Sequence, residues 1–344
     1  MSKKKVKVGD LVLGGDKIYI QSMLNVPAEK IRESVEQAVA LEKAGCEIIR
    51  AAIPTIEDVR LIPAIKEAVS IPLVADIHFD YRIAVAAVEA GVDKVRINPG
   101  NIGGTDRVKA VADACRTHGV PIRIGVNSGS LERSLLEKYG SPTPEALVES
   151  ALSHVKLLND CDFDDIVISI KSSDVKLMIA AYRLLAQQVD YPLHLGVTEA
   201  GTERMGLVKS AVGIGSLLCD GIGDTIRVSL TADPVKEIYA AKDILRACGI
   251  GGGVQIVSCP TCGRTKIDLI TLAEKVENLC SGIDKPIKIA VMGCAVNGPG
   301  EAREADIGIA GGNGEGIIFR KGTILRKVPE DKLLEELKKE IDLL

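Results

Sequence analysis

The chain of 344 residues has no tryptophan and three phenylalanines, so its core cannot be built from large aromatic side chains. No segment approaches 18 consecutive apolar residues, and the basic start of the chain runs into Gly9 and Asp10 without an apolar stretch. A membrane-spanning helix and a secretory signal are therefore not expected. The net charge of -4 provides no positive surface for nucleic acid. These absences predict a cytoplasmic protein with neither a membrane nor a nucleic-acid partner.

Aliphatic residues and glycine are abundant instead. Hydrophobic residues make up 46% of the chain, and there are 34 glycines. This composition is typical of parallel strands joined to helices by short turns. The nine cysteines are not clustered as disulfide-bonded cysteines are, which indicates a reducing compartment. Those that lie in or beside apolar runs are predicted to be core residues, and they are Cys46, Cys115, Cys161, Cys219 and Cys248.

A repeat of apolar strand, turn and amphipathic helix runs from Lys17 to about Gly249. The predicted strands cover residues 18–23, 46–51, 73–77, 94–97, 122–126, 166–170, 193–197 and 225–228. The predicted helices cover residues 28–44, 56–69, 81–90, 105–118, 144–159, 175–189, 202–219 and 234–247. Eight such pairs predict a (β/α)8 TIM barrel over residues 1–249. An open doubly wound sheet is the alternative, but the first strand is not followed by a glycine-rich nucleotide-binding turn.

The five residues 249–253, four of them glycine, are predicted to link the barrel to a small α/β domain over residues 250–344. Strands are expected near residues 254–257, 287–291 and 306–309, and a helix over 266–279. A hairpin that turns at Lys321 and Gly322 and a helix from Glu330 complete this domain.

Three cysteines in the small domain have the spacing of metal ligands. Cys259 and Cys262 are separated by two residues, and Cys294 follows after thirty-one more. Thiolates at this spacing can bind one soft metal centre. Three thiolates and an oxygen ligand would suit an iron–sulfur cluster with one exchangeable iron.

A structural zinc ribbon is the alternative, and it needs four nitrogen or sulfur ligands. No histidine follows His194, so the fourth ligand would be Cys280 or Cys248. Cys280 follows apolar residues at helical spacing and is better interpreted as a core residue. The spacing alone leaves cluster, zinc site and coincidence open.

Polar residues lie in or just after the predicted barrel strands, and TIM barrels carry their chemistry at the carboxyl ends of their strands. They are Arg50, Asp76, His78, Arg96, Asn98, Arg123, Asn127, Ser169, Lys171, His194, Glu199, Arg227 and Ser229. Four arginines and one lysine on one rim repel each other unless an anion offsets their charge. Because arginine donates in a fork that matches phosphate oxygens, we expect a diphosphate-bearing small molecule. Glu199 is expected to donate a proton or orient a group. Asp76 and His78 are both expected to bind substrate. The alternative for Asp76 is to tether an arginine.

Several motifs together resemble a known family. They are Cys259-Pro-Thr-Cys262-Gly-Arg-Thr, Val291-Met-Gly-Cys294-Ala-Val-Asn-Gly-Pro-Gly-Glu301-Ala, Ala75-Asp-Ile-His-Phe79, Arg96-Ile-Asn-Pro-Gly-Asn101-Ile-Gly and Arg123-Ile-Gly-Val-Asn127-Ser-Gly-Ser. Over essentially the whole chain, the sequence closely resembles the two-domain bacterial form of the 4-hydroxy-3-methylbut-2-enyl diphosphate synthase family, which acts in the methylerythritol phosphate route to isoprenoids. The rival interpretation is a non-redox barrel enzyme, similar to dihydropteroate synthase or an aldolase, with a zinc ribbon.

The resemblance implies a [4Fe-4S] cluster held by Cys259, Cys262, Cys294 and Glu301. It implies reductive ring opening and dehydroxylation of 2-C-methyl-D-erythritol 2,4-cyclodiphosphate, with electrons from ferredoxin or flavodoxin. It also implies that Glu199 protonates the reacting end. The residues that would hold the diphosphate are Arg50, Arg96, Arg123, Asn127, Lys171, Arg227 and Ser229.

The chain connection predicts a partner subunit. The eighth helix runs antiparallel to the strands, so its end near Ala247 is expected at the opposite end of the barrel from the strand ends. That helix is about 20 Å long, whereas a five-residue linker reaches at most roughly 17 Å. The small domain of one chain cannot readily reach the mouth of its own barrel. We therefore expect a head-to-tail homodimer with a shared active site.

Overall fold

The computed structural model describes residues 2–281, 283, 285–294, 300 and 302–344. It divides into two compact units, Met1–Cys248 and Gly249–Leu344, and each is described by itself. In the part of the chain that is described, no helix is both long enough and apolar enough to cross a bilayer.

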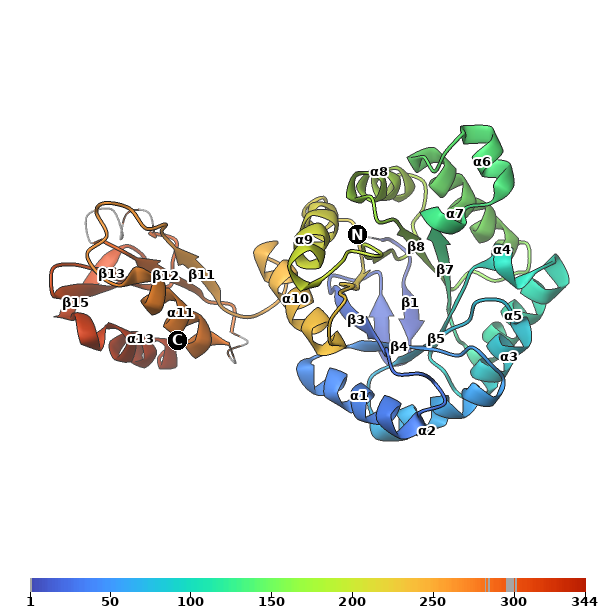
Figure 1. Ribbon diagram of the computed structural model, residues 1–344, viewed down its shortest axis with the longest axis horizontal. Helices are drawn as coiled ribbons and strands as arrows, with labels where there is room; N and C mark the ends of the chain where they lie inside the picture. Colours follow the sequence, from blue (N-terminus) through green and yellow to red (C-terminus); the bar gives the residue numbers. More distant parts are fainter. Residues whose placement is uncertain (1, 282, 284, 295–299, 301) are drawn as a thin grey trace. The chain divides into compact units, whose positions relative to one another are not determined.

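A closed parallel barrel forms the first unit. Its described strands are β3 (Tyr19–Met23), β4 (Ile48–Ala52), β5 (Leu73–Asp76), β6 (Lys94–Ile97), β7 (Ile122–Asn127), β8 (Ile166–Lys171), β9 (His194–Leu195) and β10 (Thr225–Ile226). They pair in the order β8-β7-β6-β5-β4-β3-β10-β9. A parallel bridge between Ile168 and Leu193 joins the two ends of this order, so the sheet closes on itself (Figure 1). The predicted TIM barrel is confirmed, and each predicted strand overlaps an observed one.

Helices surround the barrel, as Figure 1 shows. Those that follow the strands are α1 (Ile31–Ala44), α2 (Leu61–Ala68), α3 (Tyr81–Glu89), α5 (Thr105–His118), α7 (Pro144–Asn159), α8 (Val175–Ala186), α9 (Glu203–Cys219) and α10 (Pro234–Ala247). Side-chain caps begin several of them: Thr143 accepts from the Ala146 amide, Asp174 from the Leu177 amide and Asp233 from the Val235 amide.

In the described part of the first unit, three short helical elements were not predicted. They are α4 (Pro99–Ile102), η2 (Ser128–Ser130) and α6 (Arg133–Tyr139). The 3-10 helix η1 (Glu57–Arg60) lies within the predicted helix over residues 56–69. In α4, the Asn98 side chain accepts from the Gly100 amide at 3.0 Å and Pro99 occupies the first helical position. One turn is too short to produce a helical period in the sequence, which is why the pattern did not predict it.

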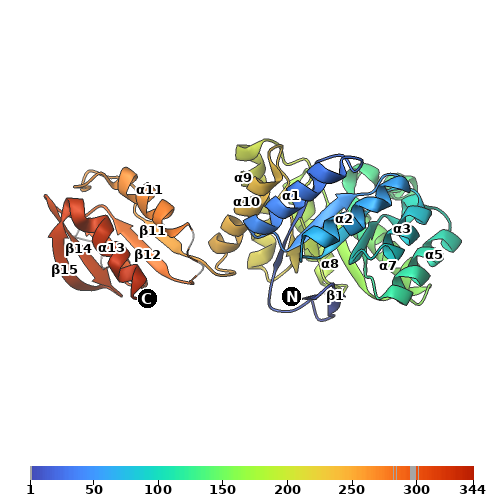
Figure 2. The same ribbon diagram turned by 90° about the horizontal axis from the view of Figure 1, so that it is seen from below.

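An N-terminal hairpin covers the end of the barrel at which the strands begin. Its strands β1 (Val6–Val8) and β2 (Leu11–Leu13) are antiparallel. Their buried residues Val6, Val8 and Leu13 pack in one cluster with Tyr19, Ile48, Val74 and Val167 of the barrel strands. The chain turns at Gly9 and Asp10. Figure 2 shows the hairpin at one end of the barrel. The opposite end, where the strands finish, is the end left for a site.

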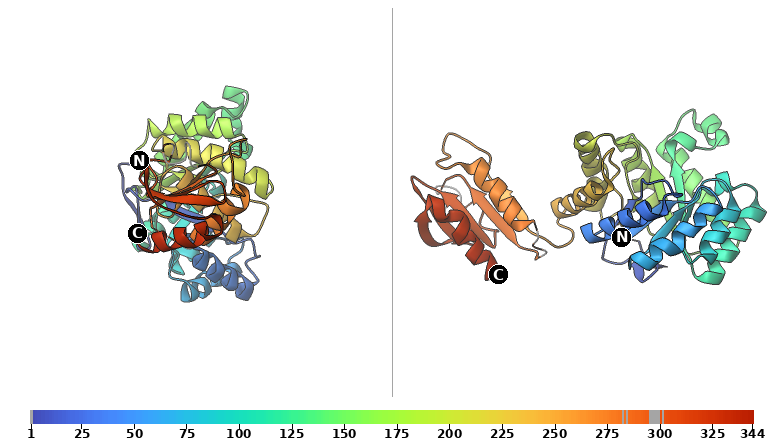
Figure 3. Two further views of the ribbon diagram at one scale, coloured as in Figure 1. Left: turned by 90° about the vertical axis from the view of Figure 1, so that its left-hand side faces the viewer. Right: turned by 60° about the horizontal axis from the view of Figure 1, so that its bottom comes forward.

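The described part of the second unit contains a five-stranded sheet and the helices α11 (Leu269–Cys280) and α13 (Leu333–Asp342). The described strands are β11 (Gln255–Ser258), β12 (Lys288–Met292), β13 (Ile307–Gly311), β14 (Glu315–Arg320) and β15 (Thr323–Pro329), paired in that order. The first three are parallel and the last three antiparallel. Helices α11 and α13, the latter preceded by η3 (Glu330–Lys332), share one aliphatic core with the sheet (Figure 3). The predicted small α/β unit is thereby confirmed.

Candidate active site

The interior of the barrel is lined by basic side chains. Because side chains alternate along a strand, residues two apart project to the same side. Arg50 on β4, Arg96 on β6, Arg123 on β7 and Lys171 on β8 are all buried, and Arg123 is fully so. Arg96 and Arg123 are directly opposite each other in the paired strands. The structure therefore brings together cations from four strands that are far apart in the sequence.

One carboxylate organises two of these arginines. Asp76 Oδ2 accepts from Arg50 Nη2 at 2.9 Å, and Asp76 Oδ1 accepts from Arg96 Nη1 at 3.1 Å. His78 Nε2 lies 3.3 Å from Asp76 Oδ2. Burial opposes ionisation of Asp76, but Arg50, His78 and Arg96 outweigh it and hold the pKa of this carboxyl well below its usual value. Asp76 is thus an ionised tether for two arginines in the site.

Other donor atoms of the same arginines lack acceptors. Within the described residues, no hydrogen-bond partner reaches Nε, Nη1 or Nη2 of Arg123, Nε or Nη1 of Arg50, or Nε of Arg96. Burial, Arg50 and Arg96 lower the pKa of Arg123 well below its usual value. A buried charged group without a partner is costly, so these donors need an occupant that carries acceptors. A phosphate group meets that need in charge and in number of oxygens.

Arg227 is oriented by a residue that the sequence interpretation missed. Glu237 on α10 accepts from Arg227 Nη2 at 3.2 Å. It also accepts from the Ser22 hydroxyl at 2.9 Å and from the Leu230 amide at 3.1 Å. Acidic residues are common in the first turn of a helix, so nothing in the sequence distinguished Glu237 from a surface carboxylate. Its burial to 3% exposure is what reveals the role.

The remaining predicted residues lie around the end of the barrel. Asn127 pairs in register with Lys171 at the ends of β7 and β8. Ser229 is half-buried just after β10, and His78 is more exposed, just after β5. Glu199 is exposed after β9 and has a φ of 50°. That left-handed conformation is uncommon for glutamate and is often found at functional sites.

The absence of a side chain at Gly125 leaves the space that the Arg96 guanidinium occupies. A Cβ on Gly125 would lie 2.6 Å from Arg96 Nη2 and would also overlap Nε of the same guanidinium. We expect Gly125→Ala to displace Arg96 and break its bond to Asp76, which would raise the KM for an anionic substrate about 10- to 100-fold. Gly104→Ala is the control, because a Cβ there meets no atom within 4 Å. Steady-state kinetics and thermal melts of both variants test this, and an unchanged KM in Gly125→Ala would contradict it.

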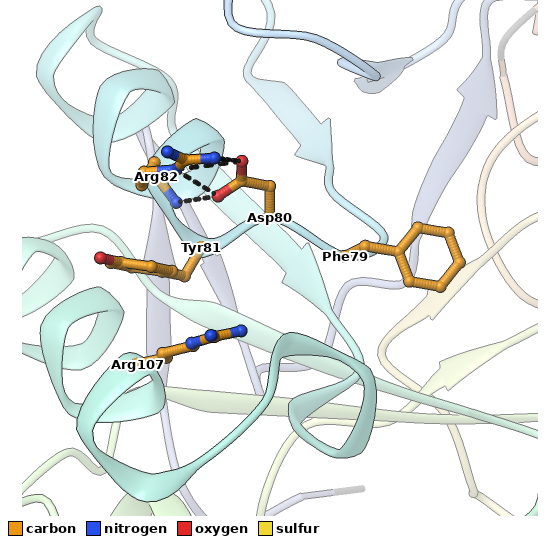
Figure 4. Close-up of a pocket in the computed structure, with 5 residues that line it drawn as sticks. All are labelled: Phe79, Asp80, Tyr81, Arg82 and Arg107. Atoms are coloured by element: carbon orange, nitrogen blue, oxygen red, sulfur yellow. Dashed lines mark hydrogen bonds and ion pairs between the residues drawn. The ribbon is translucent and has the colours of Figure 1, made fainter.

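A hollow beside the mouth is lined by Phe79, Asp80, Tyr81, Arg82 and Arg107 (Figure 4). Arg82 is held by Asp80, with Nη2 to Oδ2 at 2.6 Å, and Arg107 lies over the Tyr81 ring at 5.9 Å. Phe79 points away from the other four side chains in Figure 4 and is 71% exposed. Because these charged groups already have partners, we assign the site to the barrel interior and not to this hollow.

Two loops of the second unit carry the three cysteines predicted to bind metal. Cys259 follows β11 and Cys294 lies just after β12, and these strands are parallel neighbours. Cys259 Sγ accepts from the Gly293 amide at 3.1 Å, which places the two loops side by side. Hydrogen bonds with the backbone and side chain of Arg264 lower the pKa of Cys262, as metal binding by a thiolate requires.

The cysteines of the second unit differ in how far their side chains are buried. Across the described ranges, no three His, Cys, Asp or Glu side chains lie close enough together to hold a metal ion. Glu301, the predicted fourth ligand, lies outside the described residues. Cys280 is buried in the core shared by α11 and the sheet. This burial agrees with the prediction that Cys280 is a core residue.

The other cysteines are mostly core residues as predicted. Cys46, Cys115 and Cys161 are buried, and Cys248 is half-buried. The prediction is wrong for Cys219, which is exposed. It is the last residue of α9, and its position beside an apolar run reflects the preceding turns of the helix.

Two family domains account for nearly all of the chain. Residues 3–242 match the GcpE TIM-barrel domain, and residues 255–343 match the GcpE protein C-terminal domain. The chain belongs to the GcpE family. This GcpE-family chain is 59% identical, over 98% of both chains, to the 4-hydroxy-3-methylbut-2-en-1-yl diphosphate synthase (flavodoxin) of Clostridium perfringens. It is 56% identical to the enzyme of the same name from Bacillus cytotoxicus, over 99% of this chain and 93% of the other.

Solved structures resemble the barrel of this GcpE-family protein at low sequence identity. A dihydropteroate synthase from Stenotrophomonas maltophilia superposes with a TM-score of 0.52 and 15% identity, over 71% of this chain and 96% of the other. A type I 3-dehydroquinate dehydratase from Clostridium difficile gives 0.52 and 14%, over 71% and 97%. At such identities the likeness shows the barrel fold alone.

Proposed function

We propose that this protein is a 4-hydroxy-3-methylbut-2-en-1-yl diphosphate synthase. It would open and dehydroxylate 2-C-methyl-D-erythritol 2,4-cyclodiphosphate reductively and thereby act as an oxidoreductase of isoprenoid biosynthesis. The near full-length identity to curated relatives of that name supports this proposal. The observation that carries it is the set of buried arginine donors without acceptors inside the barrel, because it demands a compact anion with many oxygens.

The barrel residues would hold the two phosphates. Arg123 would donate from all three guanidinium nitrogens, and Arg50 and Arg96 from the atoms not bound to Asp76. Substrate contacts are also proposed for Lys171, Asn127, Arg227, Ser229 and His78. Asp76 and Glu237 would act through the arginines they orient. This basic pocket would keep the diphosphate bound when the ring opens, so that the reacting carbon stays in place.

A [4Fe-4S] cluster held by Cys259, Cys262, Cys294 and Glu301 is the proposed cofactor. When bound, it supplies two electrons, one at a time, for breaking a carbon–oxygen bond. Cys259 and Cys294 follow the neighbouring strands β11 and β12, and Cys262 lies three residues beyond Cys259. A carboxylate as fourth ligand is more exchangeable than a thiolate. Flavodoxin is the proposed electron donor, because the relatives' names include it. Ferredoxin remains the alternative donor.

Glu199 is the proposed proton donor. The reaction releases a hydroxyl group as water, and a carboxyl group at the end of the barrel can supply the proton that this requires. Glu199 is exposed beyond β9 in a left-handed conformation.

The sequence offers no membrane segment or nucleic-acid surface, and we propose that the enzyme works in the cytoplasm.

The decisive test is an anaerobic assay with the cyclic diphosphate, flavodoxin and a flavodoxin reductase. We expect the protein to be brown, to absorb near 400 nm, to contain iron and sulfide, and to convert this substrate. A colourless protein that contains zinc and leaves the substrate unchanged would support the rival class, a dihydropteroate synthase-like barrel with a structural zinc ribbon. The resemblance to dihydropteroate synthase concerns the fold alone, so it does not favour that rival.

The proposed assembly is a head-to-tail homodimer with shared active sites. The five linker residues after the end of α10 would be too few to bring the second unit of a chain to the strand ends of its own barrel. In a one-to-one mixture of Cys294→Ala and Arg123→Met chains, half of the dimers would be mixed. Each mixed dimer would have one intact site of two, so about 25% of wild-type activity is expected. Activity no higher than that of each variant alone, with mixed dimers verified by mass spectrometry, would rule out a shared site.

A further inference from the structure

Lys94 lies deeper in the barrel than the residues of the proposed substrate site. It begins β6, two residues before Arg96 on the same side of the strand, and is opposite Val74 of β5. Val74 belongs to the apolar cluster that the N-terminal hairpin closes. Lys94 is fully buried, and among the described residues its Nζ has no hydrogen-bond partner. Such a lysine is costly to bury and needs an explanation other than packing.

The charges that act on Lys94 are cationic. Arg123 and Arg50 lower its pKa, and Lys94 in turn lowers that of His194. Further charged or titratable groups that are buried or partly buried in the barrel unit include Asp76, Arg96, Lys171, Tyr182, Arg227 and Glu237. Asp76 and Glu237 are already paired with arginines. Among the described residues of the barrel, neither of these two buried carboxylates is therefore left to pair with Lys94.

This charge balance determines the state of the amine. Burial, followed by Arg123 and Arg50, lowers the pKa of Lys94 to about 7. Lys171 and His194 are shifted in the same direction by burial and by the neighbouring arginines, so their pKa values are also well below the usual ones. An anion bound by Arg123 would oppose these effects at Lys94, because it would neutralise the cation that lowers the pKa of Lys94 most.

We propose that Lys94 is largely a neutral amine in the empty barrel above neutral pH and takes up a proton when an anion binds above it, so that substrate binding and protonation of Lys94 are coupled. Lys94 is then a positioning residue that adds a positive charge beneath the diphosphate only when the diphosphate is present. The identity of the substrate in this inference rests on the proposed function. The coupling itself does not, because any anion in the site would produce it.

The coupling predicts the direction in which anion affinity and fold stability change with pH. A lysine with a pKa of about 7 is roughly 9% protonated at pH 8, so binding at pH 8 would add about 0.9 proton at Lys94. Affinity for the anion should therefore fall as pH rises from 7 to 9. The unfolded chain keeps Lys94 protonated up to about pH 10.4. Lys94 thus destabilises the empty fold most at and below pH 7, and this penalty disappears as pH rises toward 10.

Calorimetry on the full-length, cluster-loaded protein tests the proposal. Binding heats are measured at pH 8 in buffers of different ionisation enthalpy, with sulfate as one ligand and the cyclic diphosphate as the other. Neither ligand exchanges protons between pH 7 and 9, so the proton count belongs to the protein. We expect Lys94→Met to take up about 0.9 proton fewer than wild type. Uptake by Lys171 occurs in both proteins and cancels in the difference. Lys109→Met, on the exposed side of α5, is the matched control and should behave as wild type.

Melting temperatures provide the second readout. Lys94→Met is expected to melt above wild type in the empty form, with a gap that is larger at pH 7 than at pH 9. Equal proton uptake in wild type and Lys94→Met would overturn the proposal, as would a lower melting temperature for Lys94→Met at both pH values. If Lys94→Met does not fold, the sulfate affinity of wild type decides, and an affinity that stays constant from pH 7 to 9 overturns the coupling. If sulfate shows the coupling and the cyclic diphosphate does not bind, the inference holds and the proposed function fails.

Discussion

Cys294→Ala is expected to lose all measurable activity together with its iron. Two thiolates and a carboxylate cannot retain a cluster that three thiolates and a carboxylate hold, so iron per chain should fall from about four to less than one. The loop of Cys294 lies beside Cys259, as the bond from the Gly293 amide to Cys259 Sγ shows. Iron and sulfide analysis and the absorbance near 400 nm, both on anaerobically purified protein, measure the effect.

Cys280→Ala is the matched control, because Cys280 is in the same unit but is buried between α11 and the sheet. It should keep its iron and activity and lose about 1 kcal/mol of unfolding free energy, which is typical for removing one heavy atom from a core. Loss of the metal in Cys280→Ala as complete as in Cys294→Ala would instead identify a fourth sulfur ligand. That result would support the zinc ribbon.

Arg123→Met is expected to lower kcat/KM by about 10²- to 10⁴-fold without destabilising the empty protein. Each charged hydrogen bond to a phosphate oxygen contributes about 1.5–3 kcal/mol, and at least two would be lost. The empty protein should be as stable as wild type or more so, because Arg123 is fully buried and no described residue accepts from its guanidinium. Steady-state kinetics and thermal melts measure the two effects.

Arg133→Met serves as the control for Arg123→Met. Arg133 is an exposed residue of α6 whose partner, Glu137, is one turn away on the same helix. An exposed pair of this kind contributes at most a few tenths of a kcal/mol, so kinetics and stability should both match wild type. If Arg123→Met had normal kcat/KM but a much lower melting temperature, Arg123 would be a structural residue, and the proposed diphosphate site would be wrong.

The repeating part of the architecture could be predicted from the sequence because its cause is local. Strands of two to six residues alternate with helices of 8 to 17 residues, and several boundaries have their own glycine, proline or capping residue. Barrel strands end at one edge, so residues at those ends, such as Arg96 and Arg123, could be expected to meet. The close spacing of Cys259 and Cys262 is equally local.

The partners within the site could not be predicted in this way. Whether Asp76 binds substrate or tethers arginines depends on the stagger of β4, β5 and β6, which no spacing in the sequence reports. Glu237 and Gly125 were missed for the same reason, since the first looks like a helix-start carboxylate and the second like an ordinary strand glycine. Lys94 was predicted only as the first residue of a strand, and nothing in the spacing showed that its side chain is buried.

The sequence by itself determined the order of strands and helices, the division into a barrel and a small α/β unit, and the residue types available at the strand ends. Periodicity and turn chemistry suffice for these because they act over a few residues. Only the tertiary structure decided which cations are paired, which are buried without an acceptor, and how deep Lys94 lies. Those properties arise when strands remote in sequence pack around one axis, where exclusion of water makes each unpaired charge costly.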